Sequence, residues 1–93
     1  MNIFQTNIFI KQVKKLHKNQ KKELDHAVKQ IIANPLVGEA KKGDLQGILV
    51  YKFYMNNQLT LLAYEHDEPR NQLILLSLGA HENFYRDLKE QIH

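Results

Sequence analysis

The chain contains 93 residues, of which 43% are hydrophobic and 25% are charged, with a formal net charge of +3; these values are ordinary for one globular domain spanning 1–93. Because it has no cysteine, it is neither a disulfide-stapled miniprotein nor a protein with a cysteine zinc site or a thiol nucleophile. No apolar run approaches the roughly 20 residues of a membrane span, and the N-terminus lacks the features of a signal peptide, so we expect a cytoplasmic domain with no membrane partner.

The first third of the chain predicts a short strand and a pair of amphipathic helices. The expected ranges are 2–5 for the strand, 7–18 for the first helix and about 21–33 for the second. In the first helix, Phe9, Val13 and Leu16 recur with the i, i+4, i+7 spacing of one buried face. The second helix ends before Pro35, because proline disfavours the helical conformation in the residue that precedes it. Two helices with so short a connection favour an antiparallel hairpin.

A glycine-containing loop at 36–47 separates these helices from a region with the two-residue period of β-strands. Three strands and a final helix are predicted, at 49–55, 59–66, 73–78 and 83–92. The turns between the strands fall at Asn56-Asn57 and at 67–71, as expected for an antiparallel meander. We therefore predict the α+β class with the order β-α-α-β-β-β-α. In this fold an antiparallel sheet carries an N-terminal helical hairpin on one face, and the chain ends in a C-terminal helix.

Charge is distributed unevenly between the two halves of the chain. Residues 1–42 hold nine lysines and three acidic residues, a balance of +6, whereas residues 43–93 hold four basic and seven acidic residues, a balance of −3. A basic half on a small domain favours an acidic partner, either a nucleic acid or an acidic protein segment. A lysine-rich helix surface that simply faces water is the alternative.

Five histidines are candidates for acid–base chemistry, since an imidazole gains or loses a proton near neutral pH. Three of them are expected at the surface: His17, His26 and the terminal His93. His66 lies where a strand meets a turn, and it is a metal ligand, an acid–base group or simply a polar residue at a strand end. His81 follows Gly79-Ala80 at the end of the most apolar strand and precedes the last helix, the kind of junction at which functional groups concentrate. A helix-capping or solvent-facing histidine is the alternative for His81.

A basic and aromatic face is predicted on the first of the three central strands. Lys52 interrupts the apolar residues of this strand and shares a face with Tyr54, so that face is expected to be partly open. Together with the loop residues Lys41-Lys42, it offers point charges for phosphates and an aromatic platform for a base. The alternative is an exposed sheet face with ordinary cross-strand pairs.

The sequence lacks the motifs of several common kinds of functional site. It has no metal-ligand motif, no glycine-rich phosphate loop and no Ser/His/Asp arrangement, with Ser77 as its only serine. We therefore expect neither a metal nor a cofactor. RNA cleavage without a metal is chemically feasible, and it needs a base to activate the 2′-hydroxyl, cations beside the phosphate and an acid for the leaving oxygen.

Short motifs occur in order along nearly the whole chain. They are Val13-Lys14-Lys15-Leu16, Asn34-Pro35, Leu45-Gln46-Gly47, Tyr51-Lys52, Tyr64 and the segment from Leu78 to Arg86. Together they resemble the RelE/ParE superfamily of bacterial toxins, most closely its RelE-like and YafQ-like branch, whose members cleave mRNA in the ribosomal A site. In this resemblance Lys52 matches an RNA-contacting lysine of RelE, and His81 matches a catalytic position that is a histidine in YafQ-like toxins. Tyr54 and Leu61 stand where RelE carries a lysine and an arginine.

The resemblance implies the toxin of a type II toxin–antitoxin module, acting as a ribosome-dependent mRNA endoribonuclease that inhibits translation. His81 would then be the general acid or base, Lys52 the phosphate stabiliser, and Tyr85 a group that stacks on a base or orients the scissile bond. RNA contacts are expected from five further residues: Lys41, Lys42, Tyr54, His66 and Arg86. The implied partners are an acidic antitoxin, mRNA and the ribosome.

The ParE branch of the same superfamily implies a different function, because its members bind DNA gyrase and cleave nothing. A gyrase inhibitor is therefore the alternative to the RNase, and an inactive binding module is a third possibility. Since ParE members do not depend on a histidine at this position, His81 favours the RNase branch.

Overall fold

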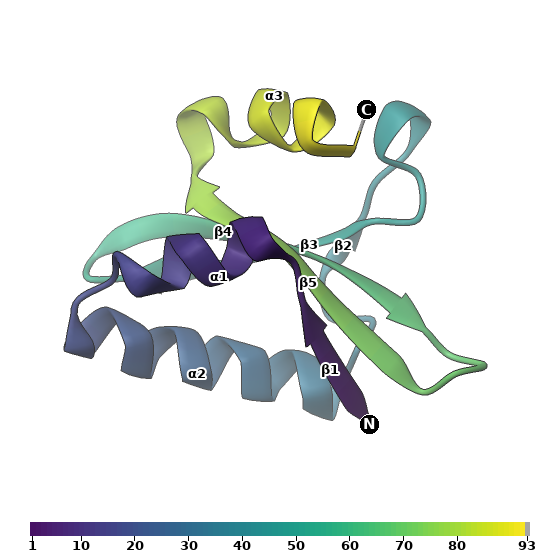
Figure 1. The fold of residues 1–93 in the computed structure, drawn as a ribbon, viewed down its shortest axis with the longest axis horizontal. Coiled ribbons are helices and arrows are strands. Elements are labelled where there is room, and N and C mark those ends of the chain that lie inside the picture. The colour runs from purple at the N-terminus through teal and green to yellow at the C-terminus, as the bar shows by residue number, and fades with distance from the viewer. Residues whose placement is uncertain (93) are drawn as a thin grey trace.

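A five-stranded sheet and three α-helices make up the computed structural model, which describes residues 1–92 (Figure 1). The elements in chain order are β1 (Asn2–Gln5), α1 (Asn7–Lys14), α2 (Lys18–Ala33), β2 (Glu39–Ala40), the short 3₁₀ turn η1 (Gly43–Leu45), β3 (Leu49–Met55), β4 (Gln58–Asp67), β5 (Gln72–Ala80) and α3 (His81–Ile92). The predicted α+β class and the order of the predicted elements are confirmed. The structure adds β2 and η1 inside the expected loop, and the terminal His93 lies outside the described residues.

The strands lie in the order β1-β5-β4-β3-β2. The predicted antiparallel meander is confirmed for β3, β4 and β5, whereas β1 runs parallel to β5 at the edge of the sheet. Thr6 stabilises this edge through two hydrogen bonds. Its hydroxyl donates a hydrogen bond to the Leu76 carbonyl at 2.7 Å and accepts one from the Phe9 amide at 3.1 Å. The same side chain therefore caps the start of α1 and ties it to β5.

Two helices begin earlier than predicted. The second helix starts at Lys18 rather than near residue 21, because the Gln20 side chain turns back and accepts a hydrogen bond from the His17 amide at 2.8 Å. The last helix starts at His81 rather than at residue 83. His81 therefore belongs to the first turn of α3, and the helix fixes the position of its backbone.

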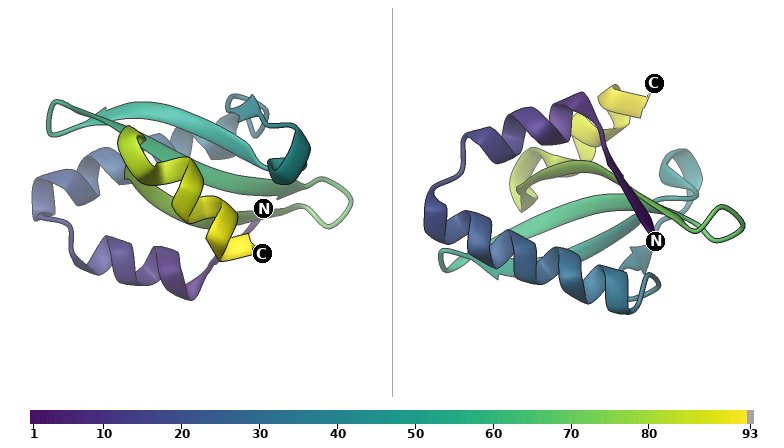
Figure 2. Two further views of the ribbon diagram at one scale, coloured as in Figure 1. Left: turned by 90° about the horizontal axis from the view of Figure 1, so that it is seen from above. Right: turned by 60° about the horizontal axis from the view of Figure 1, so that its bottom comes forward.

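Helices cover both faces of the sheet (Figure 2). The hairpin of α1 and α2 packs on one face, which we call the hairpin face, and its core includes Phe9, Ile31 and Leu62. On the opposite face, the α3 face, Phe84 and Leu88 of α3 pack against the strands. Both faces of β4 and β5 are therefore buried, as their apolar composition requires. None of the helices within residues 1–92 is long and apolar enough to cross a membrane.

One irregularity in the sheet decides which residues of β5 reach the α3 face. Ala63 pairs with Ser77 and Tyr64 pairs with Leu75, so Leu76 is an extra residue in β5. Such a β-bulge resets the alternation of side chains along a strand. Beyond the bulge, Gly79 lies opposite Leu61, whose side chain belongs to the α3-face core.

Candidate active site

The candidate residues of the central strands meet on the α3 face of the sheet. Lys52 of β3 lies opposite Leu61 of β4, which in turn lies opposite Gly79 of β5. Because neighbouring strands are about 4.8 Å apart, the Cα atoms of Lys52 and Gly79 are about 10 Å apart. His81 follows Gly79 by two residues at the start of α3. Lys52 and His81 therefore flank one row of the sheet, with the fully buried Leu61 between them.

His81 and Tyr85 lie one turn apart on α3, and their rings meet edge to face. The ring centroids are 6.1 Å apart and the planes are inclined at 86°. Tyr85 is half-buried and also meets the buried Phe84 ring edge-on, with a centroid separation of 5.3 Å. The His81 side chain itself is exposed. Its imidazole thus has a fixed neighbour but remains open to a substrate.

Lys41 joins this group on the α3 face from the edge of the sheet formed by β2. The short strand β2 pairs with β3, with Glu39 opposite Val50, and the Lys41 amide donates to the Ile48 carbonyl at 2.9 Å. The Lys41 ammonium lies 2.7 Å from the Glu39 carboxylate and 4.9 Å from the centroid of the Tyr85 ring. These two contacts hold Lys41 between β2 and α3.

The charges of this group influence one another. The hydrogen bond from Lys41 lowers the pKa of Glu39, the Lys41 charge adds to this effect, and the charge of Lys52 lowers the pKa further. The hydrogen bond to Glu39 in turn raises the pKa of Lys41, and the Tyr85 hydroxyl contributes to that rise. Glu39 and Lys41 are therefore both charged at neutral pH. We call five residues the α3-face cluster: Glu39, Lys41, Lys52, His81 and Tyr85.

Three of the predicted RNA-contacting residues surround this cluster without joining it. Tyr54 shares the face of Lys52 at the sheet edge, and its side chain is 69% exposed. Lys42 is exposed immediately before η1. Arg86 is exposed on α3, where its Nε lies 3.7 Å from the Asp87 carboxylate. All three are open to solvent, as contacts to flanking nucleotides would require.

His66 is the one predicted residue that the structure does not bring to this surface. It lies six residues along β4 from Thr60, which pairs with Ala80 beside the cluster, and this separation corresponds to roughly 20 Å. His66 lines a separate cavity of about 560 Å³. Within residues 1–92, no group of three or more His, Asp or Glu side chains is arranged to hold a metal ion.

Glu39 is the residue that the sequence did not single out. It stands in the segment expected to be a loop, and its strand is only two residues long. The one signal is the alternation of Glu39-Ala40-Lys41, which places an acid and a base on the same side of an extended chain. The pairing of Glu39 with Val50 then brings this side chain to the α3 face.

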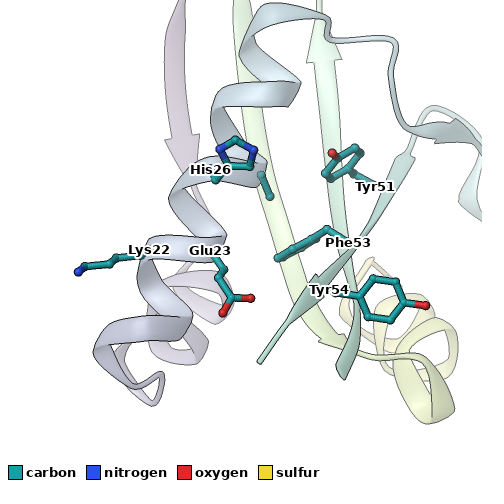
Figure 3. Close-up of a pocket in the computed structure, with 7 residues that line it drawn as sticks. Lys22, Glu23, His26, Tyr51, Phe53 and Tyr54 are labelled. Carbon is teal, nitrogen blue, oxygen red and sulfur yellow. The ribbon is translucent and has the colours of Figure 1, made fainter. Parts of the chain in front are cut away.

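A second concave surface lies between α2 and the edge of β3 (Figure 3). This groove has a volume of about 400 Å³, and the Tyr51 and Phe53 rings, with centroids 6.0 Å apart, form one of its walls. Glu23 of α2 points toward this wall (Figure 3) and accepts a hydrogen bond from the Asn56 amide at 2.8 Å. Because β2 pairs with β3 only as far as Val50, the rest of this β3 edge has no partner strand among residues 1–92.

A comparison with models of protein families assigns the chain to a family of small toxins. The sequence model for the ParE-like toxin of type II bacterial toxin–antitoxin systems matches residues 3–89. The match spans nearly all of the chain, and the chain belongs to this family. A comparison with curated protein sequences found no match.

Solved toxin structures share the fold. A variant of the Escherichia coli RelE toxin in its free state superposes with a TM-score of 0.75 at 15% identity, over 99% of this chain and 97% of that chain. A chain of the intact E. coli RelBE toxin–antitoxin complex has a TM-score of 0.70 at 16% identity, over 87% and 96%. A YoeB/ParE toxin from Agrobacterium tumefaciens has a TM-score of 0.70 at 14% identity, over 87% and 99%. At these identities the likeness establishes the fold alone.

Proposed function

We propose that this toxin is a ribosome-dependent endoribonuclease that cleaves mRNA in the cytoplasm and so inhibits translation. The observation that carries the proposal is the α3-face cluster, in which a carboxylate, two ammonium groups and an imidazole share one side of the sheet. These are the base, the phosphate-stabilising cations and the acid that RNA cleavage through the 2′-hydroxyl requires. The resemblance to RelE supports the ribosome as the place of cleavage.

Each residue of the cluster has a role in the proposed reaction. The ionised Glu39 carboxylate takes the proton of the 2′-hydroxyl, whose oxygen attacks the adjacent phosphorus. Lys41 and Lys52 stabilise the negative charge that develops on the phosphate oxygens. Protonated His81 gives its proton to the 5′-oxygen as the P–O bond breaks, which leaves a 2′,3′-cyclic phosphate and a 5′-hydroxyl. Tyr85 keeps Lys41 in position. The flanking nucleotides contact Lys42, Tyr54 and Arg86.

A toeprint assay with purified toxin tests this function on ribosomes programmed with a defined mRNA. We expect cleavage within the A-site codon and an upstream fragment that ends in a 2′,3′-cyclic phosphate. The same mRNA without ribosomes is the control and should be cut much more slowly. If the mRNA on the ribosome stays intact, the proposal is wrong.

Inhibition of DNA gyrase without cleavage is the second candidate function. One observation favours it: the matched family is ParE-like. A supercoiling assay with purified gyrase separates the two functions when the same toxin preparation is used for both assays. Loss of supercoiling together with intact mRNA would support the gyrase inhibitor and contradict the RNase.

An acidic antitoxin is the proposed protein partner. The RelE relative above was solved in a toxin–antitoxin complex, and the lysine-rich residues 1–42 of this chain suit an acidic segment. Such a segment would place apolar side chains in the groove beside Phe53 and carboxylates near the lysines of α2. Co-expression of the toxin with an acidic reading frame that adjoins its gene is expected to restore growth. A Phe53→Ser variant should then need more antitoxin for the same rescue.

A further inference from the structure

We propose that Tyr64 is a positioning residue for the cleavage reaction, acting through the chain segment that carries Glu39 and Lys41. This inference rests on the proposed endoribonuclease function. Tyr64 belongs to β4 and points to the hairpin face, whereas the α3-face cluster lies on the other side of the sheet. Its side chain therefore cannot touch the substrate, and it acts only through the residues that it holds.

The Tyr64 hydroxyl holds both ends of a short turn. It donates a hydrogen bond to the Pro35 carbonyl at 2.6 Å and accepts one from the Gly38 amide at 3.0 Å. Within the turn, the Val37 amide donates to the Asn34 carbonyl at 2.9 Å. Tyr64 is completely buried. One buried hydroxyl thus contacts the chain both where it leaves α2 and where it approaches β2.

Gly38 shows how closely the chain approaches this ring. A Cβ atom at Gly38 would lie 2.7 Å from the Tyr64 hydroxyl oxygen and 2.9 Å from the ring carbon Cε1. Any other residue would therefore push the segment away from the phenol or displace the ring. Glu39 is the very next residue, so a shift at Gly38 passes directly to the carboxylate of the cluster.

Apart from the contacts of Lys41 with Glu39 and Tyr85, few interactions hold the short strand β2. Only Glu39 and Ala40 pair with β3, opposite Val50 and Leu49, and one further backbone bond follows from Lys41. Both residues of β2 are exposed, so apolar burial contributes little to their placement. The Tyr64 hydrogen bonds are thus the buried anchor of this segment. Burial raises the pKa of Tyr64, so the phenol keeps the proton that it donates to Pro35.

A conservative variant separates this role from general stability. Tyr64→Phe removes both hydrogen bonds and keeps the ring, and Ser77→Ala is the matched control, because it removes a buried hydroxyl that contacts Gln12 far from β2. Single-turnover cleavage on programmed ribosomes should fall roughly 10-fold or more in Tyr64→Phe, since small misplacements of catalytic groups cost this much. Affinity for the ribosome should stay unchanged, and Ser77→Ala should cleave like the wild type.

A double-mutant cycle with Glu39→Gln tests the route of the effect. If Tyr64 acts through Glu39, then Tyr64→Phe should lower the cleavage rate by less than about twofold in the Glu39→Gln background. The inference would be overturned if Tyr64→Phe lowered the cleavage rate by the same factor with and without Glu39→Gln. It would also be overturned if the Tyr64→Phe variant cleaved as fast as the wild type.

Hydrogen exchange provides a readout that does not depend on activity. In Tyr64→Phe the amides of Gly38 and Lys41 should exchange faster, while the amides that pair β4 with β5 keep their protection. Unchanged exchange at Gly38 and Lys41 would overturn the inference whether or not the toxin cleaves RNA. Faster exchange at these amides in a toxin that cleaves no mRNA would instead contradict the proposed function alone.

Discussion

The ammonium nitrogen of Lys41 lies 4.9 Å from the centre of the Tyr85 ring. Lys41 follows β2 and Tyr85 belongs to α3, so this cation–π contact joins two elements that are far apart in the sequence. Each residue has a second partner, Glu39 for Lys41 and His81 for Tyr85. The contact therefore links the proposed base to the proposed acid through two side chains.

Replacement of His81 should abolish cleavage without unfolding the toxin. The side chain is exposed and follows β5 directly, so His81→Ala removes the proposed acid and leaves the core intact. We expect cleavage on the ribosome to fall roughly 100- to 10,000-fold, with unchanged thermal unfolding. His17→Ala, another exposed histidine, is the control and should cleave normally. Full activity in His81→Ala would exclude His81 from the chemistry.

Removal of the Lys41 charge should move the acid limb of the pH–rate profile to higher pH. Lys41 is the main cause of the lowered pKa of Glu39, and the proposed base must be ionised. Activity is lost as the pH falls through the pKa of Glu39, and Lys41→Met raises that pKa toward its ordinary value. Single-turnover rates across the acidic range provide the measurement. Lys42→Met is the control and should leave the acid limb at its wild-type pH. If the acid limb lies at the same pH in Lys41→Met and Lys42→Met, Glu39 is not the base.

Truncation of Leu61 should cost considerable stability. Leu61 is fully buried on the α3 face, in a core that also contains Phe84 and Leu88. We expect Leu61→Ala to lower the free energy of unfolding by about 2–5 kcal/mol, as measured by urea denaturation. The half-buried Leu59 on the same strand is the control, and Leu59→Ala should cost less. Equal losses in the two variants would mean that Leu61 is not a central core residue.

Stability in alkaline solution should depend on Tyr64. Burial raises the pKa of this phenol above its ordinary value of 10.0, so the folded state holds the proton more tightly than the unfolded state. The resulting stabilisation is complete below about pH 10 and is lost as the pH rises through the folded-state pKa. Urea denaturation at increasing pH should show a fall in the free energy of unfolding, and this fall should be shallower in Tyr64→Phe than in the wild type. Tyr54→Phe, at an exposed position, should leave the fall unchanged.

The elements that could be predicted from the sequence are those with a local period. Alternation over 49–55 and the apolar run at 73–78 indicated β3 and β5, and the spacing of Phe9 and Val13 indicated α1. The parallel pairing of β1 could not be predicted, because it depends on a partner distant in the chain. The start of α2 was displaced because Gln20 acts as a cap through its side chain.

The candidate site was predictable only in part. Lys52 and His81 are predicted from their positions in a strand and before the last helix, Tyr85 is predicted from the family resemblance, and the roles of all three remain predictions. Lys41 is expected in the loop at 36–47, and in the structure its side chain is only 18% exposed, because it lies between Glu39 and Tyr85. Glu39 was missed because a two-residue strand has no period to detect.

The bulge at Leu76 makes the length of the following segment critical. Four residues separate Leu76 from His81, and side chains in a strand alternate between faces. Deleting or inserting one residue here would turn the end of β5 over and start α3 on the wrong side of the sheet. Changes of length in the turn between β4 and β5 leave this spacing unchanged. In an insertion or deletion scan of this toxin, we therefore expect no functional variant in which the number of residues between the bulge and α3 is changed.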